Sequence, residues 1–426
     1  MKKTKIFSAV AIAAVMALAA GCTGGTGASS SSSNAADGEI TGEITFQTWS
    51  LKNDKFTPYF EKLVKDFQDA HPGVTVKWID QPGDGYEQKV LQQANAGELP
   101  DVVNLPDTFA YQLAQVDKLV NLKEADPNLE STYVKGGLDG YTFDGLDGTW
   151  AYPWYLGTDL DWWNADQLKE AGFDKTPTSF DEFVTMAKEA AEKTNGKVKL
   201  LSSLPGSEAL SANGIEMIKD GKFAFNGPDA VKIVQAYADL YQAGAMPAEA
   251  LNGDYAGNAS MFTQGKVGYT TATPSFVTQL TNDAPSLLPS VDVSARFLTP
   301  PLFVQGLSVS KESKNMATAM AFAQFAANNE NQVEFVKLAQ GFLPGTKEAN
   351  EHPEQLTTNI DDPLLEKAMT LAAEQMTRAE GNKWIQFSDD MKKFTDGQIA
   401  LALQGKTSVQ EALDAAVKYC NDALAQ

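Results

Sequence analysis

The chain has 426 residues, 43% of them hydrophobic and 10% aromatic, and its net charge is −21. This hydrophobic content is typical of a soluble protein with a packed core. The roughly 390 residues that follow the N-terminal segment exceed what one core usually supports, so we expect two lobes. The acidic balance argues against nucleic acid as a partner, because such binding depends on neutralising phosphates with Lys and Arg.

The N-terminus has the features of an export signal. Three lysines precede an apolar run over residues 6–20, and small residues lead to Cys22. The run is shorter than the roughly 20 residues that a permanent membrane-spanning helix needs. Cys22 is similar to the cysteine of a bacterial lipoprotein signal, whose thiol carries lipid such as palmitate; an ordinary secreted protein is the alternative. We therefore predict a signal peptide over residues 1–21, lipidation of Cys22, and a flexible Gly/Ser/Thr linker over residues 22–40.

The first half of the chain alternates strands and helices. Period-two alternation predicts strands over 43–49 and 74–79, and an apolar run predicts a buried strand over 101–105. Helices are predicted from 57 to about 70 and over 86–96, with Pro58 in a favourable first helical position. Strand–helix–strand units of this kind imply a parallel sheet covered by helices.

The pattern restarts downstream of an extended segment at 151–163. Asn164 is predicted to cap a helix that ends at Gly172, and Ser179 with Glu182 fits a capping box for a helix to about residue 192. Further helices are predicted over 228–244, 317–340, 363–380 and 389–424, the last with a break at Gly405. Strands are predicted over 267–271 and 306–310. The fold class is therefore α/β throughout.

Several kinds of chemistry find no support in the sequence. The two histidines, His71 and His352, both adjoin prolines, and the only cysteines are Cys22 and Cys420, so a His/Cys metal site cannot be assembled. Neither a nucleophile elbow nor a dinucleotide-binding glycine motif occurs. We expect no metal, no cofactor, no catalytic residue and no disulfide. A carboxylate pair for glycoside hydrolysis stays open as an alternative.

Candidate ligand contacts come from aromatic residues and from loops that follow strands. Open parallel sheets bind ligands at the carboxyl ends of their strands, and flat aromatic faces suit the C–H faces of sugars. We predict ligand contact for Trp154 and Tyr155 and core packing for Trp162 and Trp163. The strand-end candidates are Trp49, Asp54, Lys55, Asp107 and Phe109.

Short segments in a fixed order carry a family resemblance. They are ITFQTW (44–49), FQDAHPGVTV (67–76), AGELPDVV (96–103), AYP (151–153), WNADQL (163–168), FTQGKVG (262–268), SKESKN (310–315) and GKTSVQEAL (405–413). From about residue 42 to the C-terminus, the chain resembles family 1 bacterial extracellular solute-binding proteins, the maltose-binding-protein-like group of ABC sugar importers.

The resemblance implies a two-lobed periplasmic-binding-protein type II fold with a ligand cleft. Crossovers near 155–158 and 301–305 would give one lobe of residues 41–156 and 305–340, and another of residues 157–304 and 341–426. Further implied ligand positions are Thr158, Thr273, Ser275, Phe276 and Trp384. The family's aromatic position after the strand at 267–271, where a tryptophan is common, falls here at Ser275 or Phe276, so the tryptophan is absent.

The function expected from these observations is that of a lipid-anchored receptor on the extracytoplasmic face of the cell membrane. It would be a monomer that captures a carbohydrate, preferably an oligosaccharide, and delivers it to the permease subunits of an ABC importer. Two alternatives remain: the same receptor class for a peptide, amino acid or polyamine, and a cell-surface glycosidase.

Overall fold

The structure is a computed structural model that describes residues 38–253, 255–352, 354–357 and 360–425. The predicted signal peptide, Cys22 and most of the predicted linker at 22–40 lie outside the described residues. Among the described residues, no helix has the length and apolar character needed to cross a membrane.

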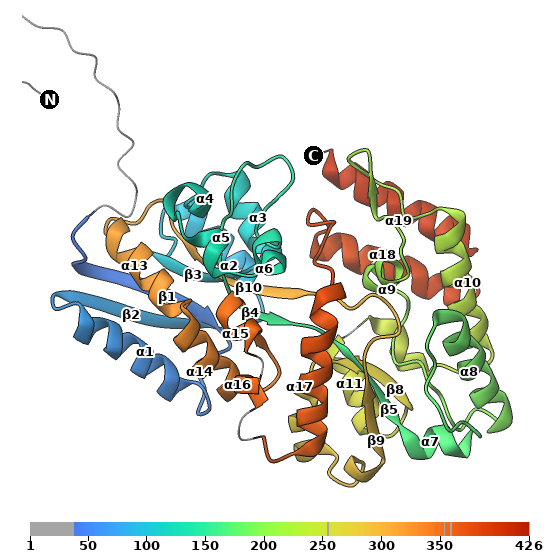
Figure 1. Ribbon diagram of the computed structural model, residues 1–426. Helices are drawn as coiled ribbons and strands as arrows, with labels where there is room; N and C mark the ends of the chain where they lie inside the picture. Colours follow the sequence, from blue (N-terminus) through green and yellow to red (C-terminus); the bar gives the residue numbers. More distant parts are fainter. Residues whose placement is uncertain (1–37, 254, 353, 358–359, 426) are drawn as a thin grey trace, which may run out of the picture. The chain divides into compact units, whose positions relative to one another are not determined.

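A six-stranded mixed sheet organises the first part of the chain (Figure 1). Its strand order is β11-β4-β10-β3-β1-β2. The bounds are β1 (Gly42–Trp49), β2 (Val74–Gln81), β3 (Val102–Pro106), β4 (Tyr152–Gly157), β10 (Phe303–Val309) and β11 (Leu343–Pro344). β1 is parallel to β2 and to β3, which confirms the predicted parallel unit. β10 is antiparallel to both β3 and β4, a pairing that the local pattern did not reveal.

Helices cover both faces of this sheet. α1 (Thr57–Ala70), α13 (Met316–Ala326) and α14 (Asn329–Ala339) pack on one face, and α2 (Tyr86–Ala96) and α3 (Asp107–Gln115) on the other. Short helices complete the unit: α4 (Leu122–Ala125), α5 (Leu129–Thr132), α6 (Lys135–Asp139), α15 (Lys347–Glu351) and α16 (Glu354–Thr357). The predicted helix over 317–340 is in fact two helices. α13 ends at Ala326, and Asn328 caps the start of α14 by accepting a hydrogen bond from Asn331 N.

A three-stranded antiparallel sheet of order β8-β5-β9 organises the second part. Its strands are β5 (Leu160–Asn164), β8 (Tyr269–Ala272) and β9 (Val291–Ser294). Trp162 and Trp163 on β5 are fully buried, which confirms their predicted core role. The rings of Trp162 and Phe276 meet edge to face, with their centroids 5.3 Å apart.

The helices around the second sheet are longer and mostly C-terminal. They are α7 (Ala165–Glu170), α8 (Phe180–Lys193), α9 (Ser207–Ala212), α10 (Pro228–Gln242), α11 (Tyr255–Thr263), α12 (Phe276–Asp283), α17 (Pro363–Gln375), α18 (Asp389–Leu403) and α19 (Val409–Leu424). Short elements are the hairpin of β6 (Ile218–Lys219) and β7 (Lys222–Phe223), and the 3-10 helices η1 (Ala248–Asn252), η2 (Leu288–Ser290) and η3 (Met376–Arg378).

Capping follows the predicted signals with one difference. Asn164 caps α7 by accepting from Gln167 N at 3.0 Å, as predicted. Ser179 caps α8 by accepting from Glu182 N at 3.2 Å, but the Glu182 carboxylate accepts from Thr178 N and not from Ser179 N. The reciprocal capping box occurs instead at the start of α19, between Ser408 and Glu411.

Two chain segments, at 158–159 and 295–302, connect the sheets close to the predicted crossovers. The predicted lobe ranges stay a prediction, and β11 departs from them. Leu343 pairs with Leu156 of β4, so residues 343–344 belong to the six-stranded sheet although the predicted boundary placed them in the second lobe. The physical reason is that α14 returns the chain to this sheet before α17 begins.

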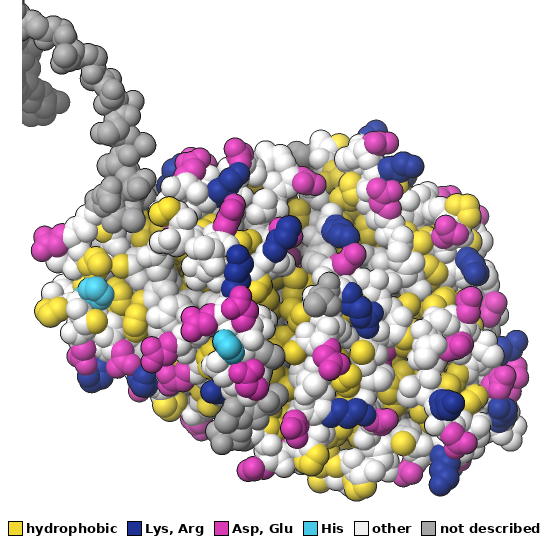
Figure 2. Space-filling view, in the orientation of Figure 1, with side chains coloured by type: hydrophobic (Ala, Val, Ile, Leu, Met, Phe, Trp, Pro, Cys, Tyr) yellow, Lys and Arg dark blue, Asp and Glu magenta, His cyan; other side chains and the backbone are white. Residues whose placement is uncertain are grey.

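On the face shown in Figure 2, basic and acidic side chains are interspersed and form no continuous basic patch.

Candidate functional site

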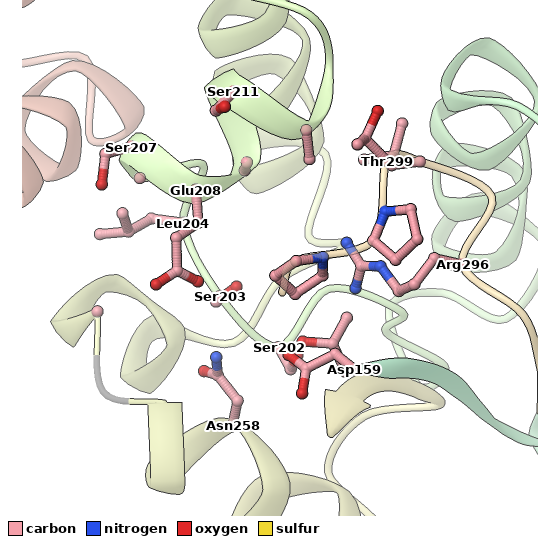
Figure 3. Close-up of a pocket in the computed structure, with 18 of the residues that line it drawn as sticks. Asp159, Ser202, Ser203, Leu204, Ser207, Glu208, Ser211, Asn258, Arg296 and Thr299 are labelled. Carbon is pink, nitrogen blue, oxygen red and sulfur yellow. The ribbon is translucent and has the colours of Figure 1, made fainter. Parts of the chain in front are cut away.

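A cavity of about 180 Å³ lies among the elements around the three-stranded sheet (Figure 3). We call it the polar cavity, because its wall includes Asp159, Ser203, Glu208, Asn258 and Arg296, with Trp384 beside them. These side chains come from the segment after β4, the loop before α9, the start of α9, α11, the segment after β9 and the loop before α18. The cavity therefore combines hydrogen-bond donors, acceptors and one aromatic face, which is the composition of a site for a small polar molecule.

Two glycines make room for a carboxylate in the cavity wall. A Cβ at Gly206 would lie 2.8 Å from Asp396 Oδ1, and a Cβ at Gly253 would lie 2.7 Å from Asp396 Oδ2. Any larger residue at either position would displace Asp396. Lys392 Nζ pairs with Asp396 Oδ2 at 2.6 Å, whereas Asp396 Oδ1 is buried and has no hydrogen-bond partner among the described residues.

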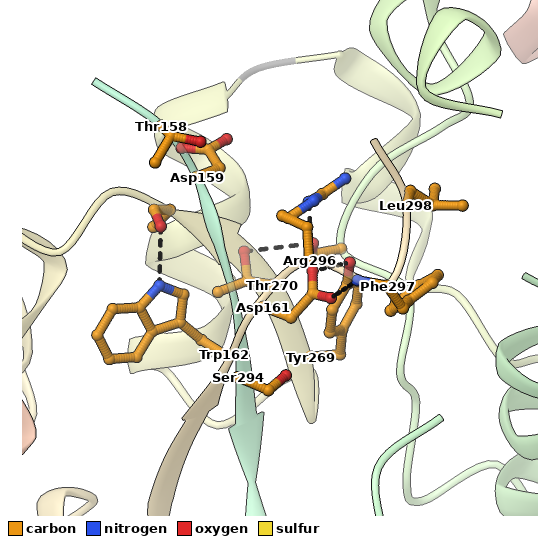
Figure 4. Close-up of polar contacts among 12 residues, drawn as sticks. Thr158, Asp159, Asp161, Trp162, Tyr269, Thr270, Ser294, Arg296, Phe297 and Leu298 are labelled. Carbon is orange, nitrogen blue, oxygen red and sulfur yellow. Dashed lines mark hydrogen bonds and ion pairs between the residues drawn. The ribbon is translucent and has the colours of Figure 1, made fainter. Parts of the chain in front are cut away.

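A buried ion pair holds Arg296 in the wall (Figure 4). Arg296 Nη1 lies 3.3 Å from Asp161 Oδ1, and the Asp161 side chain is fully buried. Tyr269 Oη donates to Asp161 Oδ1, and Phe297 N donates to Asp161 Oδ2, each at 2.9 Å. Burial raises the pKa of Asp161, while Arg296 and the two donors oppose the shift. The Asp161 carboxylate thus holds the Arg296 guanidinium in position in the cavity wall.

Carboxylates dominate the charge that faces the cavity. Glu208 is exposed to this space and points into it (Figure 3). The surrounding protein desolvates its carboxylate and so raises its pKa, which Lys392 and Arg296 partly offset. Asp159 is buried, and its charge in turn favours the protonated form of Arg296. The cavity should therefore accept ligands that donate hydrogen bonds.

One buried amide ties the wall to the connecting segments. Gln375 Nε2 donates to Thr158 Oγ1 at 3.0 Å and to Asp159 O at 2.6 Å. Its Oε1 accepts from Arg296 N at 3.0 Å. Gln375 is 3% exposed, so these bonds have no competition from water. Gln375 consequently links the backbone of Asp159 to that of Arg296, and the side chains of both residues line the polar cavity.

Three of the predicted residues meet at the ends of β1 and β3. The Trp49 ring stacks on Tyr86 with centroids 5.7 Å apart, and Phe109 lies 6.1 Å from the same tyrosine. Asp107 begins α3 beside them, and burial raises its pKa to about 6 against the opposing hydrogen bond from Thr108 N. Trp49 and Phe109 thus share Tyr86 as a neighbour, and ligand contact at these strand-end positions stays a prediction.

A second, more open groove of about 510 Å³ collects another predicted set. Lys55 and Ala339 line it on one side, and Thr273, Ser275 and Phe276 on the other. Lys55 Nζ donates to Ala339 O at 3.3 Å, and the hydroxyls of Thr273 and Ser275 lie 2.7 Å apart. Asp54 is exposed in the loop before α1 and lines neither space among the described residues.

Comparison with known proteins fits this architecture. The model of the family "Bacterial extracellular solute-binding protein" matches residues 53–333. The chain belongs to this family. A candidate binding protein of Brucella abortus (strain 2308) is 25% identical to this solute-binding protein over 335 residues, which are 74% of this chain and 78% of the relative.

Solved structures show that the fold is the two-lobed one of periplasmic sugar-binding proteins. A candidate oligosaccharide periplasmic-binding protein from Synechococcus sp. MITs9220 is similar with a TM-score of 0.78 and 24% identity, over 89% of this chain and 98% of that one. The GacH receptor of Streptomyces glaucescens, solved unliganded and with acarbose, has a TM-score of 0.72 and 22% identity over the same shares. The predicted fold class is thereby confirmed.

The predicted contact at Trp154 does not fit the packing of this solute-binding protein. Its side chain is fully buried, 4.9 Å from Phe335 in a stacked arrangement and 5.9 Å from Phe60. Ligand contact would need an open ring face, whereas Phe335 of α14 covers this one. Tyr155 is 8% exposed and lies 4.8 Å from Phe342.

The remaining predicted residues differ in burial and in whether they line the polar cavity or the groove. Thr158 is buried and accepts a bond from Gln375. Phe276 is 3% exposed and packs on Trp162 and Phe262, although it also borders the groove. Trp384 is half-buried and lines the polar cavity. It is the one aromatic position implied by the resemblance that lines this cavity in the described structure.

Sequence reasoning missed most of the polar cavity. Ser203, Glu208 and Asn258 follow no predicted strand, and Arg296 lies in an irregular segment after β9. One usable signal was the run Ser202-Ser203-Leu204-Pro205-Gly206-Ser207, because small polar residues and a Pro-Gly pair before a helix indicate a loop that can approach a ligand.

Proposed function

We propose that this protein is the lipid-anchored substrate-binding component of an ABC importer that captures an oligosaccharide and delivers it to the permease. The observation that carries the carbohydrate assignment is the polar cavity, in which carboxylates, an amide and a guanidinium surround one ring-sized space beside Trp384. Sugar hydroxyls both donate and accept hydrogen bonds, so they match a wall that offers both. Acarbose in the GacH receptor supports the same ligand class.

The lobes would close on the ligand by hinging at the connecting segments. We assign residues 41–156, 303–352 and 354–357 to the first lobe and 157–253, 255–302 and 360–425 to the second. The described residues from 341 to 357 move to the first lobe because β11 pairs with β4. A ligand shifts the equilibrium toward the closed form only if it contacts both lobes. The strand-end group of Trp49, Asp107 and Phe109 supplies the facing contacts in this proposal.

The export signal and Cys22 support anchoring on the extracytoplasmic face of the membrane, and the permease subunits are the proposed partners of a monomeric receptor. No chemical step is assigned, so the bound sugar should be released unchanged. Incubation with labelled oligosaccharides, followed by product analysis, tests this point against the glycosidase alternative.

A thermal-shift screen of glycans tests the assignment itself. A ligand at 100 times its dissociation constant stabilises the folded state by about 2.7 kcal/mol. Oligosaccharides should therefore raise the melting temperature, and solution scattering should show compaction with the same glycans. If peptides or polyamines alone raise the melting temperature, the carbohydrate assignment is wrong and the receptor class stays.

A further inference from the structure

Acidic side chains outnumber basic ones in the wall of the polar cavity. Four acidic and two basic residues line it: Asp159, Glu208, Glu380, Asp396, Arg296 and Lys392. The two basic groups are each paired with a carboxylate of the protein, at 3.3 and 2.6 Å respectively. Glu380 is likewise paired, with Lys383. The basic groups are thus matched within the protein, and the cavity keeps an excess of negative charge.

Glu208 brings this excess charge into the space (Figure 3). Its carboxylate projects into the cavity from the first turn of α9, and among the described residues it makes no hydrogen bond and no ion pair. Desolvation by the surrounding protein raises its pKa, and Lys392 and Arg296 offset this shift only in part. A positive charge within about 4–6 Å favours an ionised carboxylate. A ligand cation would therefore supply the partner that Glu208 lacks.

Asp396 gives an independent indication, because it comes from α18 and not from α9. The residue lines the cavity and is 8% exposed, yet its Oδ1 has no hydrogen-bond partner among the described residues. Gly206 and Gly253, which line the same cavity, leave room for this carboxylate. Since a buried acceptor without a donor costs free energy, this part of the wall favours a ligand that donates hydrogen bonds.

Aromatic rings form another part of the wall. Five aromatic residues line the cavity: Phe183, Tyr237, Tyr269, Phe297 and Trp384. The face of an aromatic ring attracts a cation through its quadrupole, and it also suits the C–H face of a sugar. The rings are therefore compatible with either ligand, and the excess of carboxylates is what favours a cation.

Resting on the proposed function, we propose that the polar cavity holds a protonated amine of the ligand beside Glu208, so that the receptor prefers amino sugars to neutral sugars. An ammonium group has three donors and no acceptor, which suits the carboxylates. Arg296 Nε is a buried donor of the wall without a partner among the described residues, and the hydroxyls of an amino sugar can accept from it. A polyamine has no such acceptor, and a neutral sugar has no charge for Glu208.

The test compares ligands that differ in this one group. Calorimetry on the full chain uses glucose with glucosamine, galactose with galactosamine and mannose with mannosamine, at a pH at which the amines are protonated. Cellotriose and the glucosamine trisaccharide extend the comparison to oligosaccharides, and spermidine serves as a cation without a sugar ring. We expect the amino form of the pair that binds best to bind at least about tenfold more tightly than its neutral form, because a charge-assisted hydrogen bond replaces a weaker one.

Variants at Glu208 separate charge from shape. Glu208→Gln keeps the size of the side chain and should lower the affinity for the amino form about tenfold, and that for the neutral form by much less. Glu208→Asp retains the charge and should retain the preference. Glu216→Gln, at an exposed position outside the cavity, is the matched control and should bind like the wild type. Circular dichroism and melting temperature establish that each variant folds.

The outcomes separate the two proposals. Neutral sugars that bind as tightly as their amino forms, or a preference that persists in Glu208→Gln, would overturn the amine inference and leave the carbohydrate receptor standing. Binding of spermidine alone, lost in Glu208→Gln, would overturn the carbohydrate assignment and leave the amine site standing. If neither the amino sugars nor spermidine bind, the amine inference is overturned, and the glycan screen decides the receptor assignment. A preference for the amino form that is lost in Glu208→Gln and kept in Glu208→Asp supports the inference.

Discussion

The Asp161–Arg296 pair gives a prediction whose magnitude follows from the structure. Asp161→Leu removes a fully buried carboxylate that accepts hydrogen bonds from Tyr269 Oη and Phe297 N and lies 3.3 Å from Arg296 Nη1. Breaking a buried pair by removing one partner leaves an uncompensated charge, which costs about 3–5 kcal/mol. The free energy of unfolding should fall by this amount.

The double variant Asp161→Leu/Arg296→Met separates charge from shape. Because the unpaired guanidinium is then absent, the double variant should be at least about 1 kcal/mol more stable than Asp161→Leu alone. Denaturant unfolding followed by tryptophan fluorescence measures both values. A double variant less stable than Asp161→Leu, or a cost for Asp161→Leu below about 1 kcal/mol, would refute the reasoning that Asp161 serves chiefly to hold Arg296.

Four further expectations test other parts of the molecule. Trp154→Ala should lower the free energy of unfolding by about 3–5 kcal/mol because the ring is fully buried, and a denaturant melt showing a negligible loss would contradict core packing. Burial raises the pKa of Asp107 to about 6, so if its ionised form accepts hydrogen bonds from sugar hydroxyls, glycan affinity should fall as the pH drops through 6. In calorimetry, the affinity of Asp107→Asn should not change over this pH range. A pH dependence as steep as that of the wild type would argue against this contact. Gln375→Leu, which leaves Asp159 O and Arg296 N without their partner, should weaken glycan binding about tenfold in calorimetry; unchanged affinity would remove its positioning role. Cys22→Ser should shift the protein from the membrane fraction to the medium in cell fractionation, and normal cleavage with unchanged membrane retention would contradict lipidation.

The sequence predicted the elements whose determinants are local. The helix over 86–96 and the break between α18 and α19 were predicted with correct bounds, because an apolar period and a left-handed glycine are encoded within a few residues. Gly405 has φ of +71°, a conformation that glycine adopts without strain. The strand at Gly42–Trp49 followed from its alternation in the same way.

Features that depend on distant residues could not be predicted. Trp154 was predicted to contact ligand because it lies near the point where the first sheet gives way to the second. Its burial is decided by Phe335, which lies on a helix much later in the chain. The antiparallel pairing of β10 and the return of β11 to the first sheet likewise depend on long-range contacts. Sequence patterns report local preference, whereas burial is a property of the assembled core.

The residues that shape the polar cavity also hold the segments that connect the two sheets, which bears on how binding and closure are coupled. Leu302 N donates to Glu380 O at 2.8 Å and Glu380 N donates to Pro300 O at 3.0 Å, so the segment before β10 is tied to the loop that carries Trp384. Gln375 ties the other connecting segment to Arg296. If the connecting segments hinge as proposed, a sugar ring bound in the cavity contacts the backbone at the hinge, and contacts that differ between the open and closed forms would shift the equilibrium between them. On this reasoning, loosening the tie at Gln375 should reduce affinity and ligand-induced compaction together, whereas removing the Glu208 carboxylate should reduce affinity while a saturated sample still compacts fully.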